Sequence, residues 1–195
     1  MADHIDGHIA RRIRVVILDV DGVLTDNGVY LGTGQGGERI ELKRFHIMDG
    51  LGIKMLQWAG LRVVMVSGRE SAATTLRAEE LGVECRQAPA GYKYTLATAV
   101  LAESGADWAE LAVLGDDLPD LAILCRAGLP VAVANAAAEV RAEATFVTER
   151  AGGVGAVREF AEALLQARGQ WARLVAAYQQ SREEGREVQD YVDWD

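Results

Sequence analysis

The chain of 195 residues is long enough for one hydrophobic core and leaves little room for a second full domain, so we treat residues 1–195 as a single domain. Its net charge of −9 argues against a nucleic-acid partner, which would favour a basic surface. The sequence has no apolar run of the length of a secretion signal or a membrane span. We therefore expect no membrane association and a cytoplasmic location.

Short apolar runs alternate with helical patterns along most of the chain. Five runs have the length of buried strands, at residues 13–18, 61–66, 111–114, 129–133 and 145–147. Amphipathic patterns between them indicate helices at about 51–59, 71–81, 94–103, 118–127 and 136–142. This alternation predicts an α/β fold, a Rossmann-like three-layer sandwich with a mostly parallel central sheet.

Two segments interrupt the alternation. Residues 28–45 place a glycine-rich turn between runs in which apolar and charged residues alternate, which predicts an inserted β-hairpin. The tail, about residues 169–195, is amphipathic and then acidic, and we expect its end to fray. Four residues of the tail have helical spacing and could pack on the rest of the chain, namely Trp171, Leu174, Val175 and Tyr178.

Two aspartates, Asp19 and Asp21, directly follow the first apolar run. The four large apolar residues before Asp19 are typical of a strand buried on both faces of a parallel sheet. Carboxylates gathered at the end of such a strand are unfavourable unless a metal or a cationic substrate group neutralises them. Because ligands of open α/β sheets bind beyond the carboxyl ends of the strands, the pair indicates a catalytic edge.

The segment Asp-Val-Asp-Gly-Val-Leu-Thr, residues 19–25, resembles the first motif of the haloacid dehalogenase superfamily. Members of this superfamily are mostly phosphatases that use an aspartate nucleophile. Three further landmarks follow in the expected order: a strand ending in Ser-Gly-Arg at 67–69, a lysine at position 93 that opens a helical stretch, and Gly-Asp-Asp-Leu-Pro-Asp at 115–120. On these four motifs the chain is identified as a member of the superfamily.

The resemblance implies a site for phosphate-ester hydrolysis at these motifs. Asp19 would be the nucleophile, and Asp21 would act as general acid and then as general base. Mg²⁺ would be held by Asp19, the backbone carbonyl of Asp21, and Asp116. Ser67 and Lys93 would hold the transferred phosphoryl group. Judged alone, Ser67 could be a turn residue and Lys93 a solvated helix start.

Residues beside these motifs complete the predicted site. Gly68 and Arg69 would bind phosphate or substrate, and Asp117 and Asp120 would lie in a second layer around the metal. Asp117 could equally be the N-cap of the helix that Pro119 opens. Asp120, in the first turn of that helix, could merely complement the helix dipole.

The chain has no room for the cap domain that many relatives carry. Residues 26–61 accommodate only the hairpin and one helix, and residues 93–115 only one helix. A site without a cap would be open to water, although closure strengthens electrostatic catalysis. We therefore expect a large substrate or a covering subunit, and we predict a homo-oligomer.

The short hairpin and the segments 45–53 and 151–159 narrow the resemblance to the phosphatases that act on 3-deoxy-D-manno-octulosonate 8-phosphate. Those enzymes are capless, magnesium-dependent homotetramers whose hairpins associate and whose C-terminal segments reach a neighbour's active site. They dephosphorylate an eight-carbon sugar acid during lipopolysaccharide biosynthesis. The resemblance covers roughly residues 10–165. It implies a sugar-acid phosphate substrate and a homotetramer formed through the hairpin.

The narrower resemblance assigns two more residues. Asp49 would shape the substrate entrance, and Arg158 would approach a neighbouring site and pair with the substrate carboxylate. The glycine-rich segment 152–155 would approach that site too, or it could be a flexible turn leading into a helix. Two departures concern specificity: Met48 stands where the family commonly has a basic residue, and the loop 87–93 is one residue longer.

Two other functions stay open at this stage. Capless domains of this type also occur fused to acylneuraminate cytidylyltransferases, where they organise a tetramer, so the chain could be an oligomerisation or regulatory module. Signalling receiver domains also pair acidic residues at a strand end with a hydroxyl group and a lysine, but the second acidic cluster at 116–120 fits that layout poorly. The intact Asp19, Asp21 and Asp116 favour the phosphatase.

Overall fold

The computed structural model describes residues 4–88, 90, 92–192 and 194. A six-stranded sheet runs through its centre in the order β5-β4-β1-β6-β7-β8, and every neighbouring pair in it is parallel. The predicted α/β fold is confirmed. The strands are β1 (Val15–Leu18), β4 (Arg62–Ser67), β5 (Glu84–Gln87), β6 (Leu111–Gly115), β7 (Leu129–Ala132) and β8 (Phe146–Val147).

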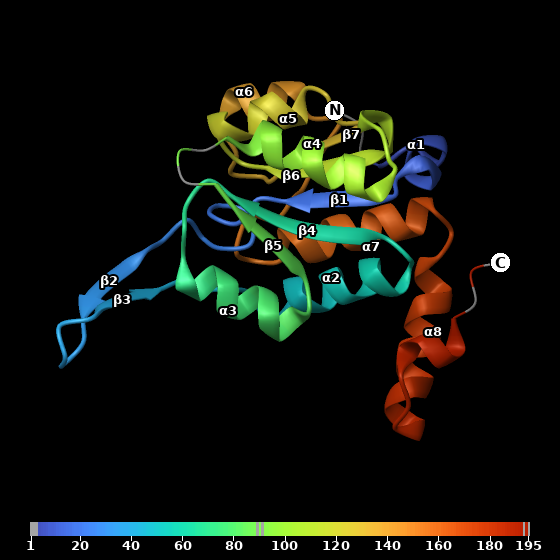
Figure 1. Ribbon diagram of the computed structural model, residues 1–195. Coiled ribbons are helices and arrows are strands. Elements are labelled where there is room, and N and C mark those ends of the chain that lie inside the picture. Colours follow the sequence, from blue (N-terminus) through green and yellow to red (C-terminus); the bar gives the residue numbers. More distant parts are fainter. Residues whose placement is uncertain (1–3, 89, 91, 193, 195) are drawn as a thin grey trace.

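Helices cover both faces of the sheet, with α4, α5 and α6 on one face and α2, α3 and α7 on the other (Figure 1). Within the described ranges no helix combines the length and the apolar character that crossing a membrane requires. The α-helices are α1 (Gly7–Arg12), α2 (Ile47–Trp58), α3 (Ala72–Leu81), α4 (Lys93–Ser104), α5 (Leu121–Leu124), α6 (Ala138–Glu143), α7 (Ala156–Ala167) and α8 (Trp171–Glu184). The short 3-10 helices are η1 (Trp108–Glu110), η2 (Leu118–Asp120) and η3 (Val188–Tyr191).

The core is built around β1, whose four residues are all buried, as expected for a strand covered on both faces. On one side of the sheet α2 and α7 pack against each other. Ile53 and Leu56 of α2 and Phe160 and Leu164 of α7 are fully buried there. This rigid centre holds the carboxyl end of β1, and therefore the residues that follow it, in a fixed position.

Strand β5 lies at the edge of the sheet and has no counterpart in the sequence prediction. Its sequence shows no alternation of apolar and polar residues, because Glu84 and Arg86 are charged and only half-buried. Both belong to an ion-pair network: Glu84 lies 2.6 Å from Arg62 on β4, which also lies 2.8 Å from Glu103 on α4. This strand is therefore marked by ion pairs to neighbouring elements and not by an alternation of apolar residues.

The predicted hairpin is present, with β2 (Tyr30–Thr33) and β3 (Arg39–Leu42) paired antiparallel. It projects from the body of the molecule (Figure 1). Its base is closed by an isolated antiparallel bridge between Thr25 and Phe45. Large apolar side chains are exposed on its strands, namely Tyr30, Leu31, Ile40 and Leu42. Such an apolar surface on a projecting element is typical of an association site.

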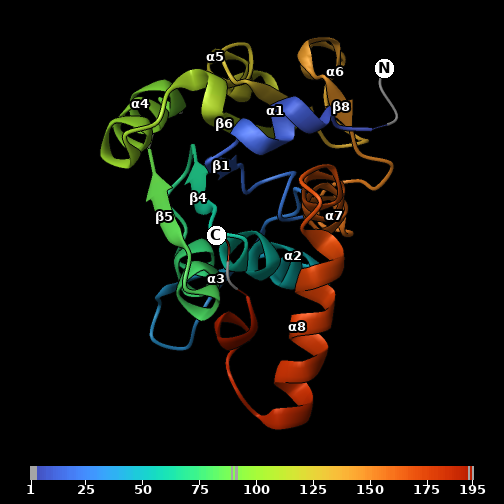
Figure 2. The same ribbon diagram turned by 90° about the vertical axis from the view of Figure 1, so that its right-hand side faces the viewer.

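The tail forms a long helix, α8, which extends from the end of the molecule opposite to the hairpin (Figures 1 and 2). The chain then turns back through η3. Trp194 returns to α2, where its Nε1–H donates to the carbonyl of Trp58 at 2.6 Å. The helical spacing predicted for the tail is confirmed, with Leu174 buried. Whether the chain end frays stays a prediction, because residues 193 and 195 lie outside the described residues.

Candidate active site

The first site residues follow neighbouring parallel strands. Leu18, the last residue of β1, pairs with Leu114 of β6 on one side and with β4 on the other. Asp19 therefore leaves the sheet beside both neighbours, and its backbone N–H donates to the carbonyl of Leu114 at 3.1 Å. Ser67 ends β4 and Asp116 follows β6. The register of the sheet thus brings three motifs to one edge.

At the centre of this edge, Lys93 forms a buried ion-pair cluster with two aspartates. Its Nζ donates to Asp19 Oδ1 at 2.5 Å and to Asp120 Oδ1 at 2.6 Å. All three side chains are almost fully buried. Burial by itself would lower the pKa of Lys93, but the two carboxylates raise that pKa above its ordinary value, so the ammonium group is retained. The lysine is thus part of the site rather than a solvated helix start.

Asp120 ties this cluster to the Asp116 loop. Its Oδ2 accepts the backbone N–H of Asp116 at 3.0 Å and that of Asp117 at 3.4 Å, while its Oδ1 is engaged by Lys93. Asp120 is therefore a buried bracing residue, and not only a partner of the helix dipole. Asp117 is exposed and directly precedes η2, and it lines a pocket together with Asp19 and Asp116. Its position is therefore compatible with an N-cap role and with a place in a second layer around a metal.

Two glycines permit close contacts with the loop after β1, one with Asp116 and one with the segment before α7. Gly22 has a φ of +99°, and a Cβ there would lie 2.0 Å from Asp116 Oδ2. A Cβ at Gly152 would lie 1.7 Å from the carbonyl oxygen of Gly22. The adjacent Gly153 donates its N–H to the Val23 carbonyl at 3.0 Å. The glycine-rich segment before α7 therefore contacts the loop after β1 of its own chain.

The carboxylates fit a divalent cation. Asp19, Asp116 and Asp120 each offer an oxygen atom, and these atoms lie within 4.8 Å of one another. Burial raises the pKa of Asp19 well above its ordinary value, and the nearby Asp120 raises it further, although Lys93 opposes this. Burial likewise raises the pKa of Asp116 to about 6. Burial is therefore the main cause of both shifts, and the charge of Asp120 adds to them. Three carboxylates face one ammonium group here, an imbalance that a divalent cation would offset.

The hydrogen bonds indicate which oxygens are free for such a cation. Both oxygens of Asp120 are engaged within the chain, so Asp19 and Asp116 are the better ligands. Asn27 Nδ2 donates to Asp116 Oδ2 at 3.4 Å and helps to orient that carboxylate. A small set of carboxylate oxygens is the kind of donor set that Mg²⁺ takes up together with water and phosphate oxygens.

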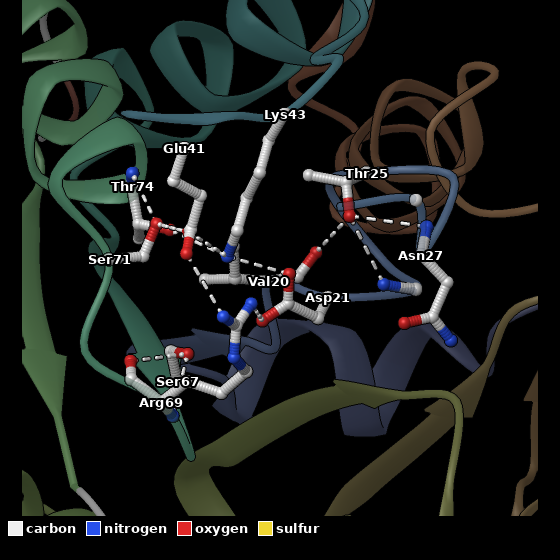
Figure 3. A network of polar contacts seen from close by, with 12 residues as sticks. Val20, Asp21, Thr25, Asn27, Glu41, Lys43, Ser67, Arg69, Ser71 and Thr74 are labelled. Atoms are coloured by element: carbon white, nitrogen blue, oxygen red, sulfur yellow. Dashed lines mark hydrogen bonds and ion pairs between the residues drawn. The ribbon is translucent and has the colours of Figure 1, made fainter. Parts of the chain in front are cut away.

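Asp21 lies in a second polar network beside this cluster (Figure 3). Lys43 Nζ is 2.7 Å from Asp21 Oδ1, and an Arg69 nitrogen is 3.8 Å from Asp21 Oδ2. Arg69 also donates to Glu41 at 3.0 Å. Lys43 and Glu41 are not predicted from the sequence, because charges that alternate with apolar residues on a hairpin indicate a solvated face. The signal that could have indicated these two residues is that the hairpin directly follows the first motif, so that its base closes beside Asp21.

A pocket of about 230 Å³ joins the two networks. Ser67, predicted to hold the phosphoryl group, is not among the residues that line it. Its buried hydroxyl accepts the Arg69 N–H at 3.1 Å and donates to the Arg69 carbonyl at 3.0 Å. Asn27, which the sequence analysis did not single out, also lines the pocket. The predicted site residues that line it are Asp19, Asp21, Gly68, Arg69, Lys93, Asp116, Asp117 and Asp120.

Asp49 and Arg158 lie in another part of the fold, away from this pocket. Asp49 is buried and its Oδ1 accepts the backbone N–H of Arg158 at 2.8 Å, so it braces the first turn of α7 from α2. The Arg158 guanidinium carbon lies 5.1 Å from the ring centroid of Trp171. Arg158 and Met48 line a separate cavity of about 550 Å³. Within one chain, neither Asp49 nor Arg158 lines the pocket of the aspartates. In the loop 87–93, Pro89 and Gly91 lie outside the described residues.

Comparisons with known proteins agree with this architecture. A protein-family model described as haloacid dehalogenase-like hydrolase matches residues 88–160. The chain is 38% identical over 157 residues to the 3-deoxy-D-manno-octulosonate 8-phosphate phosphatase of Haemophilus influenzae, covering 80% of this chain and 85% of that protein. It is also 38% identical over 160 residues to the enzyme of the same name from Escherichia coli K12, covering 82% of this chain and 83% of that one.

Solved structures show the same likeness. The 3-deoxy-D-manno-octulosonate 8-phosphate phosphatase of Moraxella catarrhalis, in complex with magnesium ion, phosphate ion and a KDO molecule, superimposes with a TM-score of 0.81 at 33% identity, covering 88% of this chain and 97% of that chain. The cobalt-bound phosphatase of Haemophilus influenzae gives a TM-score of 0.75 at 37% identity, covering 84% and 94%. The chain therefore belongs to the 3-deoxy-D-manno-octulosonate 8-phosphate phosphatase family of haloacid dehalogenase-like hydrolases, and it is a phosphatase.

Proposed function

We propose that this phosphatase hydrolyses 3-deoxy-D-manno-octulosonate 8-phosphate, or a closely related sugar-acid phosphate, with Mg²⁺ as cofactor and an aspartyl-phosphate intermediate on Asp19. The observation that carries this proposal is the buried cluster in which Lys93 joins Asp19 to Asp120 beside Asp116. The names of the relatives support the substrate, and the magnesium and cobalt ions in two related structures support the metal.

In the proposed reaction, an oxygen of Asp19 attacks phosphorus and the bond to the leaving oxygen breaks. Asp21 protonates that leaving oxygen, and then takes a proton from the water that hydrolyses the aspartyl-phosphate. Lys93 balances negative charge as it develops beside Asp19. A Mg²⁺ ion held by Asp19, Asp116 and the backbone carbonyl of Asp21 supplies Lewis-acid polarisation of the phosphoryl group when bound.

The other pocket residues take binding and bracing roles in this proposal. Gly68 and Arg69 line the pocket and bind phosphate or substrate, and Ser67 orders their loop through its bonds to Arg69. Asp117 and Asp120 form the second layer around the metal, where Asp120 holds the amide groups of the Asp116 loop.

The part of the chain that the structure describes forms no cap over the pocket, so we also propose that a homotetramer, formed through the hairpin, completes it. In that assembly Arg158 reaches a neighbouring site and pairs with the substrate carboxylate, while Asp49 holds the segment that carries it. We further propose one domain over residues 1–195, a cytoplasmic location and a role in lipopolysaccharide biosynthesis. The comparisons do not support the alternative of a non-catalytic oligomerisation or regulatory module.

The nucleophile can be tested by Asp19→Asn. The amide is a far weaker nucleophile than the carboxylate, so we expect steady-state phosphate release to fall by at least about 10³-fold. Asp107→Asn, at the amino end of β6 and far along the strand from the site, is the matched control and should keep wild-type rates. Activity of Asp19→Asn comparable to that of the control would contradict the assignment.

The metal can be tested by chelation and by Asp116→Asn. Enzyme treated with a chelator should lose activity and regain it on addition of Mg²⁺. Loss of one charged ligand oxygen should raise the Mg²⁺ concentration for half-maximal activity roughly 10- to 100-fold. The measurement is phosphate release titrated with Mg²⁺. Full activity of the chelated enzyme would reject the metal requirement.

The substrate class can be tested with a panel of sugar-acid and neutral sugar phosphates. Arg158→Met removes the proposed partner of the carboxylate, so kcat/KM should fall about 10-fold or more for the sugar-acid phosphates. Values for neutral sugar phosphates should stay unchanged. A preference of the wild-type enzyme for neutral sugar phosphates, or an equal fall on both classes, would rule out this role of Arg158.

The oligomer can be tested by Leu31→Asp, which places a charge on the exposed apolar face of the hairpin. Leu31 is 62% exposed in the single chain, so the charge should leave the fold intact but weaken association. Sedimentation velocity should show a tetramer for the wild type and smaller species for the variant. Leu76→Asp, at a position 65% exposed on α3, is the control and should remain tetrameric.

A further inference from the structure

Lys43 is a buried cation to which the proposed mechanism gives no role. It directly follows β3 of the hairpin, and its side chain has no exposed surface. A buried ammonium group is unfavourable unless it is paired and hydrogen-bonded. The groups around its Nζ atom therefore indicate the role of this side chain.

Three groups from different parts of the chain surround Lys43 Nζ. Asp21 Oδ1 lies 2.7 Å away and Thr74 Oγ1, on α3, lies 3.2 Å away. Glu41 Oε1 lies 3.9 Å away on the hairpin. The ammonium group therefore has partners on α3 and on the hairpin in addition to Asp21.

The hairpin stem is itself anchored to the catalytic edge. Glu41 accepts the Ser71 hydroxyl at 2.6 Å and a guanidinium N–H of Arg69 at 3.0 Å, both from the loop after β4 (Figure 3). The Glu41 side chain is only 11% exposed, and the Ser71 hydrogen bond lowers the pKa of its carboxyl group, so it stays ionised. The bridge between Thr25 and Phe45 closes the stem beside the loop that carries Asp21.

Asp21 has few other restraints. Its nearest other cationic partner is Arg69, whose nitrogen is 3.8 Å from Asp21 Oδ2 and makes no hydrogen bond within the described residues. The 2.7 Å ion pair with Lys43 is thus the closest charge contact of Asp21, which lines the pocket that both networks share.

We propose that Lys43 is a positioning residue that holds the carboxyl group of Asp21 in line with the leaving oxygen of the substrate. This inference rests on the proposed role of Asp21 as the proton donor to that oxygen. It makes the stem of the hairpin part of the active site, in addition to any role of its exposed apolar face in association.

A positioning role can be separated from a general structural role by varying the leaving group. An alkyl alkoxide leaves only with a proton, whereas 4-nitrophenolate leaves readily without one, so only alkyl phosphates need a well-placed donor. The ratio of kcat/KM for 3-deoxy-D-manno-octulosonate 8-phosphate and 4-nitrophenyl phosphate, measured on the same preparation, does not depend on the fraction of folded enzyme.

The test is Lys43→Met, which keeps most of the side-chain volume and removes the ammonium group. We expect kcat/KM to fall about 10- to 100-fold for the sugar-acid phosphate and by less than about threefold for 4-nitrophenyl phosphate. Thr74→Val, which removes one support of Lys43, should give the same pattern with a smaller fall. Lys54→Met, an equivalent change on α2, should leave both values unchanged.

Asp21→Asn separates the two levels of the proposal. If it produces the same leaving-group pattern and Lys43→Met does not, Lys43 has no positioning role but the proposed function stands. If Asp21→Asn itself lowers both values equally, Asp21 is not the proton donor and the inference fails with it. If both variants show the pattern, the double variant should be no worse than Asp21→Asn alone, since they act on the same step.

Discussion

The site depends on one buried contact, the ammonium group of Lys93 placed between Asp19 and Asp120. An aspartate at the end of a fully buried strand is unfavourable as a carboxylate, and burial indeed raises the pKa of Asp19. Lys93 compensates one charge, and Asp120 brings the loop of Asp116 to the same place through its second oxygen. The remaining negative charge is what makes a divalent cation a fitting partner of these residues.

The geometry around this contact leaves little space for variation. A Cβ at Gly22 would collide with Asp116, and a Cβ at Gly152 would collide with Gly22. The Asp116 side chain thus packs directly on Gly22 of the loop after β1, and the segment before α7 packs on the backbone of that same loop. This close packing lets three loops share one position, as a preorganised site requires.

The hairpin has two surfaces with different chemistry. Its strands expose large apolar side chains, as an association surface does. Its stem places Glu41 and Lys43 against Arg69 and Asp21. An assembly formed through the exposed strands would therefore be mechanically connected to the residue proposed to protonate the leaving group. In a chain without a cap domain, this gives the insertion a role inside the site as well as outside it.

Local patterns by themselves determined the parallel sheet except its edge strand β5, the hairpin and the strand-end aspartates, because apolar periodicity and short motifs depend only on nearby residues. The tertiary structure alone decided the rest. It placed Asp49 under the first turn of α7 and Arg158 against Trp171, in a different cavity from the aspartates. It also buried Lys43 beside Asp21. These placements depend on contacts between segments that are distant in the sequence. The spacing of residues along the chain therefore does not show which charged side chain becomes buried.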